Sequence, residues 1–327
     1  MSGHDQEARQ FHVLVSHIYE EHYVEELRRL FPAVEFTQLP PTAPWPDRTP
    51  TADAMLYAGL RKPDLSALLR HAPRLRWLHT GSAGFDWVMV PEIEAQGIVV
   101  TRSADVMSIP IAEFVLAAML SHAKNLARLA EAQAQHEWIL PLHQELHGKE
   151  ALVVGAGSIG TRVAGLCRAF GMRVVGVNRS GDMVPGFDAV HGADSLDGLL
   201  PSAHYVVLTA PGTSETRGMF GSRRFSLMRQ GAYLVNVARG SLVVEDALIA
   251  ALASGRLAGA CLDAFAVEPL PADSRLWETE GVLVSPHTSY RTPEIRRRVF
   301  EEFAANLGAF MTGAPLKGRM RNPELGY

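Results

Sequence analysis

The chain has 327 residues, of which 47% are hydrophobic and 20% are charged, and its formal net charge is -4 at pH 7. This length predicts two globular domains, and the composition is typical of such domains. The mildly negative charge argues against nucleic acid as a partner, and we expect no stretch to be long and apolar enough to span a membrane.

The first twenty residues are polar and then strand-like. They lack the basic start and the apolar centre of a signal peptide, so we expect a cytoplasmic protein. The two cysteines, Cys167 and Cys261, lie in apolar segments, and we expect both to be reduced core residues.

Apolar runs alternate with amphipathic segments over the first hundred residues. Strands are predicted at residues 11–16, 55–58, 75–80 and 98–101, and helices at 23–30 and 65–71. This alternation predicts a small parallel α/β domain that carries no phosphate-binding loop.

A long alanine- and leucine-rich segment, residues 109–135, predicts one helix that leads into a second domain. Strands are then predicted at residues 151–154, 173–177 and 189–191 and in the runs HYVVLTAP, AYLVNVARG, GACLDAF and VLVSPH, with helices from 158 and at 195–200, 222–228 and 244–254. The amphipathic helix at 293–311 would return the chain to the first domain.

These elements predict two doubly wound parallel α/β domains. The larger, residues 106–292, would be a Rossmann domain with a sheet of about six or seven strands. It would be inserted into a smaller, flavodoxin-like substrate domain made of residues 1–105 and 293–327.

The motif G-x-G-x-x-G lies between a predicted strand and a predicted helix. Gly155 permits the tight turn, Gly157 lets the backbone approach a pyrophosphate, and Gly160 lets the helix pack on the strand. Ser158 and Ile159 open that helix, whose first N–H groups can bind an anion. The surrounding strand-helix-strand pattern therefore predicts dinucleotide binding, which the glycines alone would not.

The end of the following strand indicates which dinucleotide is preferred. An acidic residue at this point holds the ribose hydroxyls of NAD, but the chain has Asn178, Arg179 and Ser180 there. A guanidinium and a hydroxyl suit a 2′-phosphate, so NADP(H) is predicted as the preferred cofactor, with NAD(H) possible. The alternative is that Arg179 is an ordinary surface arginine.

Three reactive side chains follow the carboxyl ends of predicted strands, where ligands bind in open α/β sheets. They are Arg239, Glu268 and His287. Each alone is compatible with a surface or loop residue, but together they supply a cation for a 2-keto acid, a proton donor and a carboxylate that tunes the donor.

The motifs GAGSIG, NVARGSLV, LDAFAVEPLP and SPHTS, with AGFDWV and ELHGK upstream, resemble the D-isomer-specific 2-hydroxyacid dehydrogenase family over nearly the whole chain. The resemblance implies that His287 donates a proton to the substrate carbonyl while Glu268 holds its imidazole and favours the cation. Arg239 would bind the carboxylate and polarise the carbonyl. The reduced nicotinamide would supply hydride, and no metal is required.

The resemblance also implies further contacts. Asp263 would lie near the nicotinamide, although it could equally cap a turn, and Ala83 and Gly84 would form a backbone clamp for the substrate carboxylate. The remaining cofactor residues implied are Ala210, Pro211, Thr216, Val237 and Ala238, and the remaining substrate residues are Tyr57 and Ser82.

The implied activity is NADPH-dependent reduction of a small 2-keto acid to the D-2-hydroxy acid, similar to that of the glyoxylate and hydroxypyruvate reductases. Tyr290 and Arg291 follow the histidine where small residues are usual, so either Tyr290 narrows the substrate pocket or both residues pack elsewhere. Two alternatives stay open: a reductase of bulkier 2-keto acids, and an NAD(P)H-sensing, corepressor-like binding protein. Excess apolar surface on the 109–135 helix and an exposed segment at 138–146 predict a homodimer.

Overall fold

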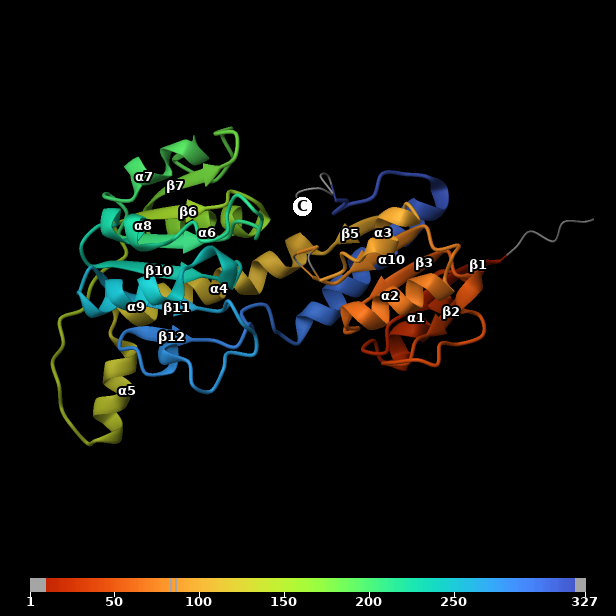
Figure 1. Cartoon of the computed structure of the whole chain (residues 1–327), viewed down its shortest axis with the longest axis horizontal. Helices are drawn as coiled ribbons and strands as arrows, with labels where there is room; N and C mark the ends of the chain where they lie inside the picture. The colour runs from red at the N-terminus through yellow and green to blue at the C-terminus, as the bar shows by residue number, and fades with distance from the viewer. Residues whose placement is uncertain (1–9, 83, 86, 321–327) are drawn as a thin grey trace, which may run out of the picture. The chain divides into compact units, whose positions relative to one another are not determined.

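The computed structural model describes residues 10–82, 84–85 and 87–320. They form two compact units (Figure 1). Unit 1 contains the described residues up to Val106 and from Pro293 onward, and unit 2 is Met107–Thr292. Each unit has its own parallel sheet and its own helical layers, so the predicted fold class is confirmed.

Unit 1 is built on a five-stranded parallel sheet in the order β2-β1-β3-β4-β5. This order is the flavodoxin-like one. The strands are β1 (Phe11–Val15), β2 (Val34–Gln38), β3 (Ala54–Tyr57), β4 (Trp77–Thr80) and β5 (Val99–Arg102). Every residue of β3 and β4 is buried, as a parallel sheet covered on both faces requires.

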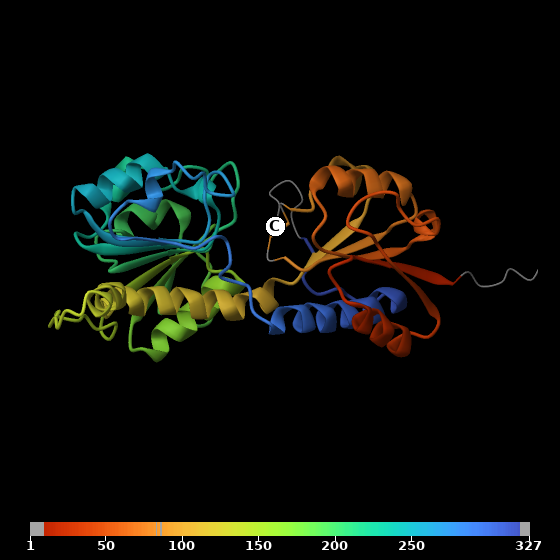
Figure 2. The same cartoon turned by 90° about the horizontal axis from the view of Figure 1, so that it is seen from below.

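Helices cover both faces of the unit 1 sheet (Figure 2). One face carries α1 (Glu21–Leu30) and α10 (Glu294–Thr312), and the other carries α2 (Lys62–His71) and α3 (Pro91–Ala95). Trp77 stacks on Phe303 with ring centroids 5.2 Å apart, which fastens α10 to the sheet. β2 and α3 are not predictable from the sequence pattern, because each has only five residues.

Unit 2 is built on a seven-stranded parallel sheet in the order β12-β11-β10-β9-β6-β7-β8. The strands are β6 (Glu150–Val154), β7 (Arg173–Asn178), β8 (Ala189–Gly192), β9 (Tyr205–Leu208), β10 (Ala232–Asn236), β11 (Leu257–Leu262) and β12 (Val282–Val284). The strand order reverses between β6 and β9. This is the topological switch point, at which α/β sheets bind their ligands.

The helices of unit 2 also lie on both faces of its sheet (Figure 2). They are α4 (Ala104–Ala123, which starts just before the unit), α5 (Leu126–Ala134), α6 (Ser158–Ala169), α7 (Leu196–Leu199), α8 (Ser222–Leu227) and α9 (Glu245–Ala253). Short 3-10 turns occur at η1 (Thr49–Thr51), η2 (Ala193–Ser195), η3 (Gly240–Leu242) and η4 (Arg275–Trp277). Cys167 and Cys261 are buried free thiols, and burial raises the pKa of each to about 12.

Two expectations about the long helix are wrong. It is not continuous, because Asn125 has a left-handed backbone (φ 50°) that ends α4 and starts α5. Residues Asp105–Ala123 also have the length and composition of a membrane span. Half of this segment is buried within the structure, and Val115 and Met119 are fully buried, so part of its apolar surface is used in packing.

Candidate active site

The glycine-rich turn lies at the switch point, where β6 ends beside β9. Gly155 has φ 112°, and a Cβ on it would lie 2.5 Å from the Ala210 nitrogen. A Cβ on Gly160 would lie 2.1 Å from the Gly155 oxygen. The Thr209 hydroxyl donates to that same oxygen at 2.7 Å. Only glycine fits at both positions, because backbone contacts backbone there.

Gly157 differs from its two neighbours in the motif. Among the described residues, nothing lies within 4 Å of the position a Cβ would occupy, and the residue is exposed. It is the N-cap of α6, which begins at Ser158 and continues through Ile159. The backbone of Gly157 is therefore open on the side where a side chain would lie. The turn fits the pyrophosphate of a dinucleotide.

The turn after β7 is organised by Asn178. Its side-chain oxygen accepts a hydrogen bond from the Gly181 N–H at 2.6 Å, and its side-chain nitrogen donates to the Asp182 carbonyl at 2.8 Å. Asn178 thus shapes the loop on which Arg179 and Ser180 stand.

Arg179 and Ser180 each bond a carboxylate. Arg179 Nη2 lies 2.6 Å from Glu215 Oε1, and the Ser180 hydroxyl donates to Asp182 Oδ2 at 2.6 Å. Both side chains are exposed at the end of β7. They stand where the adenosine ribose of a dinucleotide binds in this fold.

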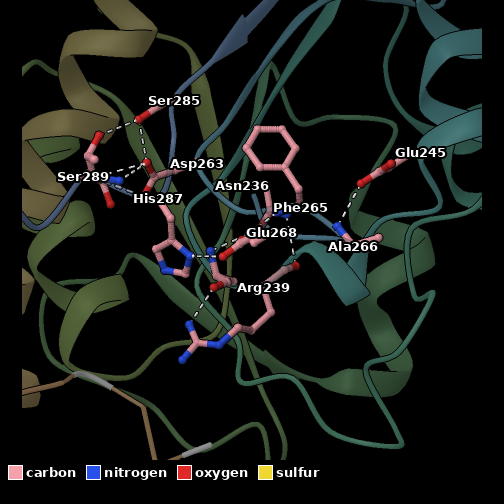
Figure 3. A network of polar contacts seen from close by, with 12 residues as sticks. Asn236, Arg239, Glu245, Asp263, Phe265, Ala266, Glu268, Ser285, His287 and Ser289 are labelled. Atoms are coloured by element: carbon pink, nitrogen blue, oxygen red, sulfur yellow. Dashed lines mark hydrogen bonds and ion pairs between the residues drawn. The ribbon is translucent and has the colours of Figure 1, made fainter. Parts of the chain in front are cut away.

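His287 and Glu268 form the centre of the site (Figure 3). Nδ1 of His287 lies 2.8 Å from Oε2 of Glu268, while Oε1 of Glu268 accepts a hydrogen bond from the Phe265 N–H at 2.9 Å. An ionised carboxylate only accepts hydrogen bonds, so this contact requires a proton on Nδ1 of His287. His287 has a left-handed backbone (φ 53°), a conformation that few residues other than glycine adopt.

Arg239 enters the site from the end of β10. Its turn is closed by Asn236, whose side chain donates to the Arg239 carbonyl at 3.1 Å and accepts from the Ala238 N–H at 3.1 Å. Arg239 Nη1 donates to the Ala238 carbonyl at 2.8 Å. A Cβ on Gly240 would lie 1.8 Å from the Phe265 carbonyl carbon, so this turn and the turn carrying Glu268 are in backbone contact.

Asp263 organises the loop that carries His287. It is 1% exposed. Its Oδ1 accepts hydrogen bonds from the Ser285 hydroxyl at 2.6 Å and the Thr288 N–H at 2.8 Å, and both of its oxygens lie 3.2 Å from the Ser289 nitrogen. Asp263 therefore caps the turn that carries His287, which is one of the two roles expected for it. Its contact with the nicotinamide stays a prediction.

The other predicted cofactor residues lie at the ends of β9 and β10. Ala210, Val237 and Ala238 are almost completely buried. The Thr216 hydroxyl donates to the Pro211 carbonyl at 2.7 Å, so it closes its own loop.

The predicted substrate residues of unit 1 lie at the end of β3 and just after β4. The Tyr57 side chain is buried, and its hydroxyl donates to the Leu60 carbonyl at 2.7 Å. Burial raises the pKa of Tyr57 to about 12. The Ser82 hydroxyl donates to the Gly84 carbonyl at 2.6 Å, which shapes that turn. Ala83 lies outside the described residues.

Tyr290 lies beside the imidazole. Its ring centroid is 6.4 Å from that of His287, and the rings meet edge to face at 80°. Tyr290 therefore lies next to His287, and the narrowing of a substrate pocket by its ring stays a prediction.

Sequence reasoning missed four residues that position the others: Thr209, Glu215, Asn236 and Ser285. Three of them do leave a signal, because Thr209, Asn236 and Ser285 are polar residues at or just after the end of an apolar strand. Glu215 leaves none, because its partner Arg179 is 36 residues away in the sequence.

Comparison with known proteins gives a consistent result. Residues 116–289 match the sequence model described as D-isomer specific 2-hydroxyacid dehydrogenase, NAD binding domain. The chain is 36% identical over 253 residues to a glyoxylate reductase of Thermococcus kodakarensis, which covers 74% of this chain and 75% of that protein. It is 34% identical over 265 residues to glyoxylate/hydroxypyruvate reductase B of Pectobacterium carotovorum, covering 79% of this chain and 82% of that protein.

A solved structure extends the likeness to both units. It is that of the NADPH-dependent glyoxylate/hydroxypyruvate reductase of Sinorhizobium meliloti, in complex with NADP and sulfate. It is similar to this chain with a TM-score of 0.82 at 25% identity, covering 97% of this chain and 100% of that one.

Proposed function

Because this chain belongs to the D-isomer specific 2-hydroxyacid dehydrogenase family, we propose that it reduces glyoxylate to glycolate or hydroxypyruvate to the D-2-hydroxy acid, with NADPH as its preferred reductant. The observation that carries this proposal is the 2.8 Å pair of His287 and Glu268 at the carboxyl edge of the unit 2 sheet. When bound, the reduced nicotinamide supplies the hydride.

In this reaction His287 is the acid. Its Nδ1 is bonded to Glu268, so the proton that it passes to the carbonyl oxygen is the one on Nε2. Glu268 orients the imidazole and stabilises its cation. The same pair takes the proton back when the hydroxy acid is oxidised.

Arg239 binds the carboxylate of the 2-keto acid substrate. A guanidinium binds a carboxylate through two parallel hydrogen bonds, and its charge stabilises the oxygen that becomes negative as hydride arrives. The Asn236 side chain and the contact between Gly240 and Phe265 position the backbone from which Arg239 extends.

The proposed preference for NADPH is supported by Arg179 and Ser180, which follow β7 and carry donors that suit a 2′-phosphate. The solved Sinorhizobium meliloti relative is described as NADPH-dependent and contains NADP, which supports the same choice here. NADH remains the second cofactor.

Tyr290 supports a small substrate. An aromatic ring next to the proton donor leaves room for glyoxylate or hydroxypyruvate more readily than for phenylpyruvate or 2-ketoisocaproate. The test is the oxidation of NADPH, and of NADH, with each of these four acids. Rapid oxidation of NADPH with one of the two small acids supports the proposal. Tight NADPH binding without turnover on any acid would favour the sensor hypothesis.

We also propose that the protein is a cytoplasmic homodimer. The segment after α5 exposes Trp138, Leu140 and Leu142 at 93%, 85% and 95% of their surface. Apolar side chains gathered in this way mark an association surface. A second copy of the chain is the proposed partner, and a monomeric mass in light scattering would contradict it.

A further inference from the structure

The two side chains proposed to hold the 2′-phosphate are both bonded to carboxylates. Arg179 pairs with Glu215 at 2.6 Å, and the Ser180 hydroxyl bonds Asp182 at 2.6 Å. A carboxylate and a phosphate compete for the same donors, because each accepts hydrogen bonds through anionic oxygens. The donors of this subsite must therefore exchange or share partners when a 2′-phosphate binds.

The loop after β9 holds Glu215 in place. The Thr213 N–H donates to the Thr216 hydroxyl oxygen at 2.8 Å, and the Arg217 N–H donates to the Thr213 carbonyl at 3.0 Å. The Thr216 hydroxyl in turn bonds the Pro211 carbonyl at 2.7 Å. These bonds close a turn around Glu215, so its carboxylate is presented to Arg179 by an ordered backbone.

We propose that Glu215 is a specificity-determining residue, which lowers the preference for NADP(H) over NAD(H) by holding Arg179 and by repelling the 2′-phosphate. This inference rests on the proposed role of Arg179 as the 2′-phosphate ligand. Glu215 adds a negative charge beside the positive charge of Arg179. Together the two residues would set the ratio of the affinities for NADP(H) and NAD(H).

The size of the effect of Glu215 on 2′-phosphate binding follows from the solvent exposure of the Arg179–Glu215 pair. The Arg179 and Glu215 side chains are 52% and 58% exposed, so their pairing is weak and Arg179 can exchange its partner for a phosphate. Removing the carboxylate charge should therefore tighten 2′-phosphate binding by about two- to fivefold. The gain should shrink with added salt, because salt screens charges at the surface.

Glu215 also bears on NAD(H). Carboxylates near the adenosine ribose of this fold accept hydrogen bonds from its hydroxyl groups, and this is how NAD is selected elsewhere. Loss of the Glu215 charge should consequently leave the binding of an unphosphorylated ribose unchanged or weaker. The substitution should therefore change the ratio of the affinities for the 2′-phosphorylated and the unphosphorylated ribose, and should not raise both affinities.

The experiment is calorimetric titration of the full chain with adenosine 2′,5′-bisphosphate and with AMP, which needs no turnover. The variants are Glu215→Gln, Arg179→Ala and Glu21→Gln. Glu21 is a matched control, since it is also 58% exposed and paired with an arginine, Arg28, at 2.8 Å. We expect Glu215→Gln to bind the bisphosphate about two- to fivefold more tightly, AMP no more tightly, and Glu21→Gln to bind both as the wild type does.

The outcomes separate the two proposals. If Arg179→Ala weakens bisphosphate binding but Glu215→Gln leaves it unchanged or weakens it, the Glu215 inference is wrong and the role of Arg179 stands. If Arg179→Ala binds the bisphosphate as well as the wild type does, the assignment of Arg179 fails, and the inference about Glu215 fails with it.

Discussion

His287 Nδ1 and Glu268 Oε2 lie 2.8 Å apart although the residues are 19 positions apart in the sequence. Each follows a different strand of one parallel sheet, and parallel neighbours end at the same edge. The other carboxylate oxygen of Glu268 is held by the Phe265 N–H at 2.9 Å. The imidazole is therefore fixed through the backbone of the β11 turn rather than by its own loop alone.

Glu268→Gln should lower kcat by about 10- to 100-fold, because an amide can still accept a hydrogen bond from Nδ1 but does not stabilise the imidazolium. The affinity for NADPH should stay within about twofold, since Glu268 does not belong to the glycine-rich turn. The measurement is kcat at saturating NADPH and keto acid. A variant that turns over as fast as the wild type would show that the Glu268 charge is not used.

Asp263→Asn should destabilise the loop of residues 285–289. The buried carboxylate accepts bonds from Ser285, Thr288 and Ser289, and an amide replaces one accepting oxygen by a donor. Leaving buried N–H groups unpaired costs about 1–3 kcal/mol. Thermal unfolding should therefore occur at a lower temperature and kcat should fall with it. A variant as stable as the wild type would show that these bonds contribute nothing.

Gly240→Ala should be damaging, since its Cβ would lie 1.8 Å from the Phe265 carbonyl carbon. The turns that carry Arg239 and Glu268 would have to separate, so kcat should drop and stability should fall by more than about 1 kcal/mol. Gly165→Ala is the matched control. Gly165 lies inside α6 with nothing within 4 Å of its Cβ position among the described residues. Alanine there should stabilise the chain by about 0.5–1 kcal/mol.

His79 should make the stability of unit 1 depend on pH. Its imidazole is fully buried, with Nδ1 2.7 Å from the Thr101 hydroxyl and Nε2 2.9 Å from the Ser103 hydroxyl. Burial lowers the pKa of His79 from 6.5 to about 3. The unfolded chain therefore binds a proton below about pH 6.5 that the folded chain does not, and the free energy of unfolding falls as pH drops from there toward 3.

The slope contributed by His79 is up to about 1.4 kcal/mol per pH unit. His79→Gln should remove this part of the slope, although it lowers stability at every pH by disturbing the buried hydroxyl network. Urea unfolding measured at several pH values between about 4.5 and 7 compares the two slopes. Equal slopes would mean that His79 is protonated in the folded protein.

Most of the fold and the candidate site residues are predictable, because the ends of buried strands can be recognised in the sequence. The glycine-rich turn, Arg239, Glu268 and His287 each follow an apolar run, and parallel topology brings those ends to one edge. Asn125 was not predictable, since asparagine is tolerated within a helix and only the structure shows its left-handed backbone. Contacts between loops, such as Arg179 with Glu215, depend on which strands are neighbours.

The most direct test compares the wild type with His287→Ala in the NADPH-dependent reduction of glyoxylate and hydroxypyruvate, with NADPH affinity measured separately by fluorescence titration. We predict a kcat at least about 100-fold lower for the variant and an NADPH Kd within about twofold of the wild type. Unchanged turnover by His287→Ala would contradict the assignment of His287 as the proton donor and, with it, the account of this site.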